Sequence, residues 1–201
     1  MKKLTIILAL TLLLAACDRP TTGEQPIWQM GYGMRELIPE DPESNTYYIA
    51  GYQNDHPAEG VLDYQRVKAV YLAAGDEAVL LIVIDCVGLS SGQVQDIRNA
   101  LPKPLRKITH VVSTHTHAGI DTLGLWGPVA IDGKDENFQQ QLTEKAVEAV
   151  EEAYKTRSLG HLYYGASSAG IEALQHDSRA PYVYDKAIHQ LRLTAEAVSV
   201  F

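Results

Sequence analysis

Residues 113–119 read Ser-Thr-His-Thr-His-Ala-Gly and contain the two imidazoles whose spacing points most directly to chemistry. They follow an apolar run that predicts a strand, and α/β sheets build their sites at strand ends. In an extended chain His115 and His117 point to the same side. Such a pair can bind a divalent metal, or one imidazole can bind metal while the other donates a hydrogen bond to substrate. A structural pair of partly exposed histidines has the same spacing, so the pattern alone leaves both interpretations open.

The residues around the pair narrow the kind of metal site. The hydroxyls of Thr114 and Thr116 can support the imidazoles from behind. A dinuclear site of the metallo-β-lactamase type needs His-x-His-x-Asp-His, and this chain has Gly119 and Ile120 where the Asp and the last His would stand. Such a site would lose two ligands at once, so this type is excluded.

A β-hairpin is predicted before the histidine segment. Two apolar, β-branched runs, 67–74 and 78–86, are joined by the turn signal Gly75-Asp76-Glu77. The second run is apolar on both faces, as in a central strand covered by a layer on each side. We expect this strand to lie in the middle of a sheet.

Helices and strands follow one another along the rest of the chain. Val94, Ile97 and Leu101 form the apolar stripe of a helix that begins at residues 90–92 and ends at Pro102. The remaining predicted elements are a strand over 108–113, a helix from about 136 to 156, and strands over 161–169 and 187–194. This order predicts an α/β fold: a layered sheet of mixed strand directions with helices packed on it.

Residues 27–66 lack sustained periodicity and are predicted to form one long loop. Loops of this length are uncommon unless they are functional. The loop contains Tyr47, Tyr48 and Tyr52. These tyrosines can form one wall of an apolar substrate pocket, or they can simply pack in the core.

The amino terminus has the layout of an export signal, Lys2-Lys3 followed by an apolar run over 4–14. The run is too short to span a bilayer. It ends in Leu-Ala-Ala-Cys, which resembles the lipobox of bacterial lipoproteins and implies cleavage of residues 1–16 and lipidation of Cys17. An ordinary secretory signal with a chance cysteine is the alternative. We expect residues 17–26 to be a polar tether and the protein to be anchored by lipid to a membrane of the cell envelope, on its periplasmic or extracellular face.

Charge and cysteine content restrict the partners. The formal net charge is −8, and removal of Lys2 and Lys3 with the signal makes it more negative. This excludes an electrostatic partnership with nucleic acid. Once Cys17 carries lipid, Cys86 is the only cysteine left, which excludes an intrachain disulfide. Its place at the end of an apolar run predicts a buried, inert thiol.

The histidine segment also resembles a known family. Residues 114–119, Thr-His-Thr-His-Ala-Gly, match the Thr-His-Thr-His-(Ser/Ala)-Gly signature of neutral/alkaline, non-lysosomal ceramidases and their bacterial relatives. The resemblance covers about residues 30–195, with further similar segments at 31–39, 48–52, 81–90 and 177–181. Two features depart from the opening motif of the family: Glu36 stands where Asp is usual, and Leu37-Ile38 replaces Ile-Thr.

This resemblance implies a zinc-dependent hydrolase that cleaves an N-acyl (sphingo)lipid-type amide. It implies that His115 is a zinc ligand, that His117 faces the scissile amide, and that Asp85 and Arg179 have catalytic roles. For Asp85 the alternative is a carboxylate that caps a loop or helix. For Arg179 it is a structural salt bridge, for example with Asp177.

In the family, the remaining zinc ligands come from positions after the strand that here ends near Ala195. We therefore expect residues 27–201 to be the N-terminal part of a larger catalytic domain, with an incomplete zinc shell and no activity alone. Completion of the site by a partner chain, a ligand-binding module, and a non-enzymatic envelope lipoprotein that keeps the fold are the alternatives.

Overall fold

A computed structural model describes residues 26–195 of the 201-residue chain. The predicted signal over 1–16, the lipidation of Cys17 and nearly all of the predicted tether lie outside the described residues. The strands are β1 (Trp28–Leu37), β2 (Gln65–Ala74), β3 (Glu77–Ile84), β4 (Thr109–Ser113), β5 (Ser158–Ser167) and β6 (Ile188–Ala195). The helices are α2 (Ser91–Ala100), α3 (Lys103–Arg106), α4 (Glu136–Lys155) and α5 (Ile171–Leu174). None of the helices within 26–195 is long and apolar enough to cross a membrane.

The six strands form one sheet in the order β4-β3-β2-β1-β5-β6. The β3–β4 pair is parallel and the other neighbours are antiparallel, so the predicted α/β fold with mixed strand directions is confirmed. The β2–β3 hairpin is also confirmed, and its turn uses Gly75 at a positive φ of 58°. β3 lies between β2 and β4, inside the sheet as predicted.

The prediction that residues 27–66 form one loop is wrong for its first part. β1 pairs with β2 along nearly its whole length, from Gln29 to Leu37. Two of its positions facing α4 are glycines, and a Cβ at Gly31 or Gly33 would lie 1.8 or 2.1 Å from a carbonyl oxygen of the helix. The helix backbone therefore packs directly on the strand, which removes from β1 the apolar alternation typical of a strand.

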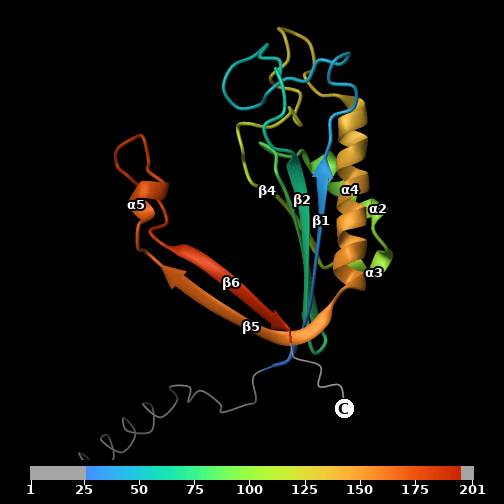
Figure 1. Cartoon of the computed structure of the whole chain (residues 1–201), viewed down its shortest axis with the longest axis vertical. Coiled ribbons are helices and arrows are strands. Elements are labelled where there is room, and N and C mark those ends of the chain that lie inside the picture. Colours follow the sequence, from blue (N-terminus) through green and yellow to red (C-terminus); the bar gives the residue numbers. More distant parts are fainter. Residues whose placement is uncertain (1–25, 196–201) are drawn as a thin grey trace, which may run out of the picture.

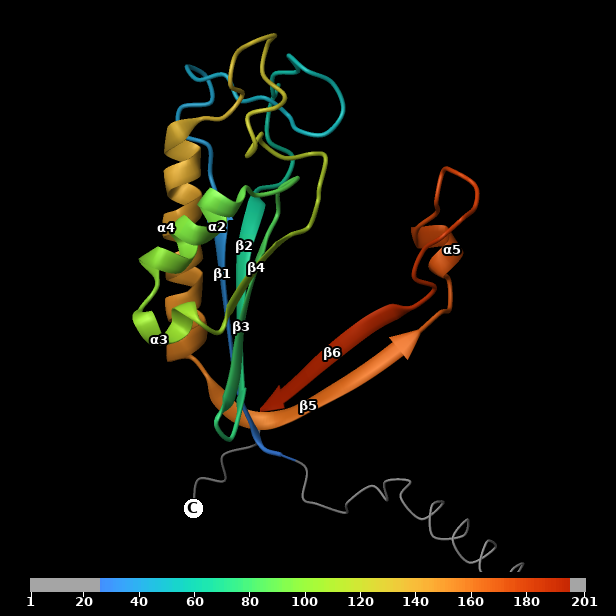
Figure 2. The same ribbon diagram turned by 180° about the vertical axis from the view of Figure 1, so that it is seen from behind.

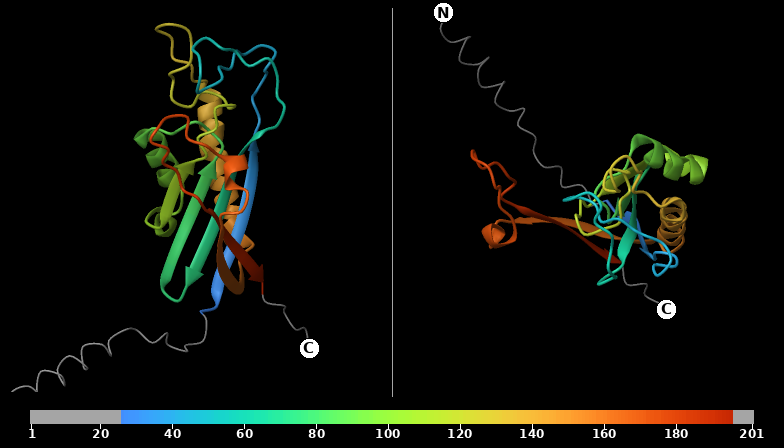
Figure 3. Two further views of the ribbon diagram at one scale, coloured as in Figure 1. Left: turned by 90° about the vertical axis from the view of Figure 1, so that its left-hand side faces the viewer. Right: turned by 90° about the horizontal axis from the view of Figure 1, so that it is seen from above.

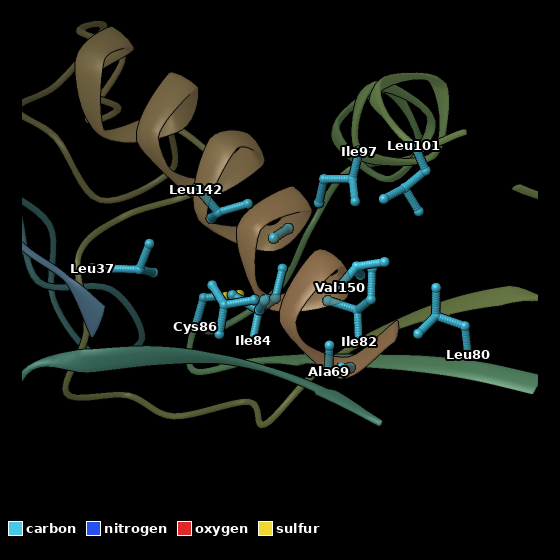
Figure 4. Close-up of a cluster of buried hydrophobic side chains, with 14 of the residues drawn as sticks. Leu37, Ala69, Leu80, Ile82, Ile84, Cys86, Ile97, Leu101, Leu142 and Val150 are labelled. Atoms are coloured by element: carbon cyan, nitrogen blue, oxygen red, sulfur yellow. The ribbon is translucent and has the colours of Figure 1, made fainter. Parts of the chain in front are cut away.

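The core lies between the sheet and one helical layer (Figures 1 and 4). α4 begins at the N-cap Asp135, whose carboxylate accepts a hydrogen bond from the Phe138 amide. The helix predicted from about 136 to 156 is thus confirmed, and its buried stripe has the spacing of an amphipathic helix: Phe138, Leu142, Ala146, Ala149, Val150 and Ala153. Alternate residues of β3, Leu80, Ile82 and Ile84, are fully buried on the same side. α2 also begins where predicted, with a capping box between Ser90 and Gln93.

Within residues 26–195 the helices α2, α3 and α4 all lie on one face of strands β1–β4 (Figure 2). The β3 residues that face away from them, Val79, Leu81 and Val83, are half-buried. The prediction of a covering layer on each side of this strand is therefore met on one side only among the described residues. β5 and β6 form a hairpin that projects from the sheet and carries the short helix α5 at its tip (Figure 1).

Candidate metal-binding site at the end of the sheet

The histidine segment lies at the edge of the sheet where β3 and β4 end. Because these two strands are parallel, their carboxyl ends meet at the same edge, and the loops that follow them lie together. The loop over 38–64 gathers at this edge as well (Figure 3). Its residues 48–50 run antiparallel to 119–121: the Ala50 amide donates to the Gly119 carbonyl and the Asp121 amide to the Tyr48 carbonyl. Segments far apart in sequence are thus hydrogen-bonded around the histidines.

His115 is held by a hydrogen bond to a backbone carbonyl. Its Nδ1 lies 2.5 Å from the carbonyl oxygen of Val87, in the loop after β3. A carbonyl oxygen can only accept, so in the neutral ring Nδ1 carries the proton and Nε2 presents a lone pair. His115 itself has a positive φ of 61°, so the segment is not extended there as the sequence analysis assumed. His115 as a whole is an exposed residue.

His117 meets His115 edge to face. Their Nε2 atoms are 3.3 Å apart and their ring centroids 4.9 Å apart, at 78° between planes. The ring of Tyr52 contacts His117 in a T-shaped arrangement at 5.0 Å. Gly51, at φ 116°, leaves the space for this ring, since a Cβ there would lie 2.4 Å from His117 Cγ. The Nδ1 of His117 is buried and has no hydrogen-bond partner in the described part of the chain.

This pair fits part of a zinc shell. Two nitrogens at ~2.0–2.1 Å from a tetrahedral zinc ion are separated by about 3.3 Å, and the two Nε2 atoms have this separation. The hydrogen bond from His115 to a carbonyl is the usual support of a metal-binding imidazole. Among residues 26–195, however, no group of three or more His, Cys, Asp or Glu side chains could hold a metal. The described residues therefore provide at most two of the three protein ligands that a catalytic zinc needs.

Two residues that the sequence analysis missed hold this segment in place. The Gln65 side chain donates to the Asp85 carbonyl and accepts from the Ile120 amide, which ties the start of β2 to the end of the histidine segment. The buried carboxylate of Asp121 accepts three backbone hydrogen bonds of 2.8 Å, from Leu123, Gly124 and Trp126. Asp121 is the second residue after the signature, and an acidic residue before a Gly-containing turn is the signal that could have indicated this role.

The structure also places the supporting residues named from sequence. Thr116 Oγ1 accepts a hydrogen bond from the Ala118 amide. Asp85 accepts from the Arg66 amide at 3.1 Å and lies 3.6 Å from Lys68 Nζ, so it links the ends of β2 and β3. Tyr47 is buried against Phe138, and burial raises its pKa. Of the three tyrosines named, Tyr52 is the one whose ring contacts a site histidine.

Arg179 is not brought to the histidines by a contact within residues 26–195. It lies in the connection from α5 to β6, at the tip of the projecting hairpin (Figure 1). Its backbone amide donates to the carboxylate of Asp177, which also accepts from the Val183 amide. These hydrogen bonds lower the pKa of Asp177. The contact with Asp177 is thus made by the Arg179 backbone.

The predicted burial of the Cys86 thiol is confirmed. Its side chain is fully buried in the core cluster. Burial is the main cause that raises the pKa of the thiol, so the reactive thiolate is disfavoured near neutral pH.

Comparison with known proteins gives a likeness of fold. No protein-family model and no curated protein matches the sequence. A crystal structure of neutral ceramidase from Pseudomonas aeruginosa matches with a TM-score of 0.66 and 14% identity, over 86% of this chain and 30% of that one. A structure of ceramidase complexed with C2 matches with a TM-score of 0.59 and 16% identity, over 72% of this chain and 23% of that one. The chain thus shares the fold of a ceramidase region and spans less than a third of either neighbour.

Proposed function

We propose that this chain forms the histidine-bearing region of a zinc-dependent hydrolase that acts on linear amides of the N-acyl lipid class. One observation carries the proposal: the hydrogen bond to Val87 leaves the His115 Nε2 with a lone pair that faces the Nε2 of His117 at 3.3 Å, at the carboxyl ends of two parallel strands. The fold likeness to two ceramidase structures supports the reaction class.

In this proposal the two histidines have different tasks. His115 holds the metal through Nε2, because its Nδ1–H is already donated to Val87. A zinc ion bound there would polarise the amide carbonyl and lower the pKa of a bound water. His117, oriented by Tyr52 and by the space over Gly51, donates a hydrogen bond to the developing oxyanion or moves a proton. The remaining protein ligands would come from outside the described residues.

Zinc titration by calorimetry of the full chain tests the metal assignment. We expect weak binding, because His115, even with His117 beside it, provides fewer ligands than a catalytic zinc needs. His115→Ala should abolish it, whereas His117→Ala should weaken it less. His110→Ala is the matched control, because His110 is an exposed histidine on β4. Tight zinc binding that is unchanged in His115→Ala would refute the proposal.

A fluorescent N-acyl lipid amide tests the reaction class. We expect turnover only when additional zinc ligands are supplied, either by a partner chain or by further sequence joined to this region. Binding of the amide without hydrolysis under those conditions would favour a ligand-binding module, and absence of both would favour an envelope lipoprotein that keeps the fold. Catalytic roles for Asp85 and Arg179 require that Asp85→Asn and Arg179→Lys lower kcat in the same assay.

The membrane location is a separate part of the proposal. Lipidation of Cys17 would place the site at a membrane surface, where amphiphilic amides are concentrated. Incorporation of labelled palmitate into the wild type in a bacterial host, and its loss in Cys17→Ser, are the expected results. Equal labelling of both proteins would remove the anchor from the proposal without affecting the zinc site.

A further inference from the structure

We propose that a cavity behind the histidine segment is a second binding site, which takes an organic cation with an apolar body. The cavity has a volume of about 640 Å³. This lies within the range of about 300–1,000 Å³ typical of small-molecule sites. Three stretches and one single residue line it: parts of the loop over 37–49, residues 58–65, residues 116 and 118–120, and Asp85. This inference goes beyond the proposed hydrolase and does not depend on it.

The cavity is separate from the histidine pair. Thr116, Ala118 and Gly119 line it, but His115 and His117 do not. The segment 116–120 therefore forms a wall of the cavity while its two neighbouring imidazoles contact each other and Tyr52. A ligand can fill the cavity without a bond to either histidine.

The lining is apolar at the base and at the rim. Leu37, Tyr47 and Ile120 form buried parts of the lining. At the rim Val61 and Leu62 are exposed, and 98% of Leu62 is accessible to solvent. Val61 and Leu62 are adjacent and belong to the lining of a cavity with apolar walls, so an apolar ligand there would cover them.

Charge selects the kind of ligand. Four carboxylates line the cavity, those of Glu43, Glu59, Asp63 and Asp85, and none of its lining residues is Lys, Arg or His. Asp85 is paired with Lys68, whereas Glu43, Glu59 and Asp63 have no ion pair within residues 26–195. Uncompensated carboxylates on apolar walls attract a cation and repel fatty carboxylates and phosphates.

The occupant is therefore an amine or quaternary ammonium that carries an alkyl chain. The chain lies against the aliphatic wall, and the ammonium group lies near Glu59 and Asp63 at the mouth. Tyr64 also lines the cavity, and aromatic faces add to the binding of quaternary ammonium groups. A neutral alkyl compound of equal length makes the same apolar contacts but lacks the electrostatic attraction to the carboxylates.

Titration of the full chain with decyltrimethylammonium below its critical micelle concentration tests the inference. The quaternary ammonium keeps its charge at every pH, and decyl sulfate and decyl glucoside serve as anionic and neutral probes of the same chain length. We expect saturable binding of the cation at least tenfold tighter than of either other probe. Added salt should reduce this difference, because exposed charges are screened.

Two variants and one control connect binding to this cavity. The double variant Glu59→Gln/Asp63→Asn should lower the affinity for the cation at least fivefold and leave the affinity for decyl glucoside unchanged. Asp76→Asn with Glu77→Gln removes the same charge at the exposed β2–β3 turn and should change nothing. Gly60→Trp should reduce binding of every probe, since Gly60 lines the cavity and a Cβ there meets nothing within 4 Å.

Equal affinity for decyl sulfate, or no effect of the Glu59/Asp63 variant, would overturn the inference. His115→Ala should bind the cation like the wild type. Zinc binding can thus be absent while cation binding is present, and cation binding can be absent while zinc binding is present. The two proposals are therefore tested independently.

Discussion

The Nδ1 of His115 lies 2.5 Å from the carbonyl oxygen of Val87, and this contact joins the loops that follow two parallel strands. It fixes which nitrogen of the ring carries the proton. It also holds a histidine whose backbone has a positive φ of 61°, a conformation that costs energy for a residue with a side chain. Packing and hydrogen bonding around the segment must therefore impose this geometry.

The tautomer of His115 can be measured. At about pH 8.5 an ordinary imidazole is neutral. At this pH ¹⁵N NMR should show His115 with Nδ1 protonated and Nε2 unprotonated. His110 is an exposed reference on β4 and should show the mixture typical of a free ring, in which Nε2–H predominates. A His115 spectrum identical to that of His110 would contradict the Val87 hydrogen bond.

Substitution of Gly51 should displace His117. A Cβ there would meet the His117 ring at 2.4 Å, and the φ of 116° is strained for alanine. We expect Gly51→Ala to lower the free energy of unfolding by about 2–3 kcal/mol and to shift the His117 ring resonances. Gly75→Ala shares the positive φ but meets nothing within 4 Å, so it should cost only about 1 kcal/mol. The free energy of unfolding of both variants is measured by urea unfolding. An equal decrease in Gly51→Ala and Gly75→Ala would show that the contact with the His117 ring is unimportant.

Gly33 should be intolerant of any side chain. A Cβ there would lie 2.1 Å from the Ala149 carbonyl oxygen, so α4 would have to move away from β1. We expect Gly33→Ala to destabilise the protein by about 3 kcal/mol or more. Gly165 lies in the exposed part of β5, where a Cβ meets nothing within 4 Å. The free energy of unfolding of Gly165→Ala should therefore stay within about 0.5 kcal/mol of the wild-type value. Thermal unfolding of both variants makes the comparison.

These glycines also explain what could be predicted from the sequence. The β2–β3 hairpin and α4 follow from apolar runs whose period matches the burial observed. β1 was missed because Gly31 and Gly33, which face α4, contribute no hydrophobic side chain to its pattern. The need for glycine there arises from the closeness of a helix more than a hundred residues further along the chain, which local sequence does not reveal.

The candidate site was predictable in its residues but not in its geometry. His115 and His117 were singled out from spacing, and their rings do meet. The prediction assumed an extended chain, whereas His115 has a left-handed backbone conformation. Gln65 and Asp121 were missed because their partners are backbone groups, and an amide or carboxylate that binds backbone carries no characteristic spacing.

Asp121 should be essential for the loop after the histidines. Its carboxylate is fully buried and accepts three amide hydrogen bonds. Asp121→Ala leaves these donors without their acceptor, and we expect a loss of about 3–5 kcal/mol. Asp121→Asn keeps the shape and one acceptor oxygen and should cost less. Hydrogen exchange should show the amides of Leu123, Gly124 and Trp126 losing protection in both; unchanged protection would contradict this role.

Cys86 should make stability fall at alkaline pH. Burial raises the pKa of its thiol in the folded protein, so the folded state keeps this proton over a pH range in which the unfolded chain loses it. The stability is complete below the unfolded pKa of about 8.5 and declines as pH rises toward the folded value. Cys86→Ala should lose less stability than the wild type between about pH 7 and pH 10 in urea unfolding. Parallel curves for the two proteins would refute this.

The projecting hairpin divides the chain into two parts that can open separately. Within residues 26–195, β5 pairs with β1 only through Trp28, Gln29 and Met30, and beyond Gly160 its ladder is with β6. The helical core of α4 against β1, β2 and β3 does not include the outer hairpin. Opening of the hairpin therefore breaks its own ladder and leaves the core intact. A protease that cuts near α5 would accordingly separate β6 from the chain, whereas β5 stays attached to α4 and the histidine segment, on the other side of β1, keeps its geometry.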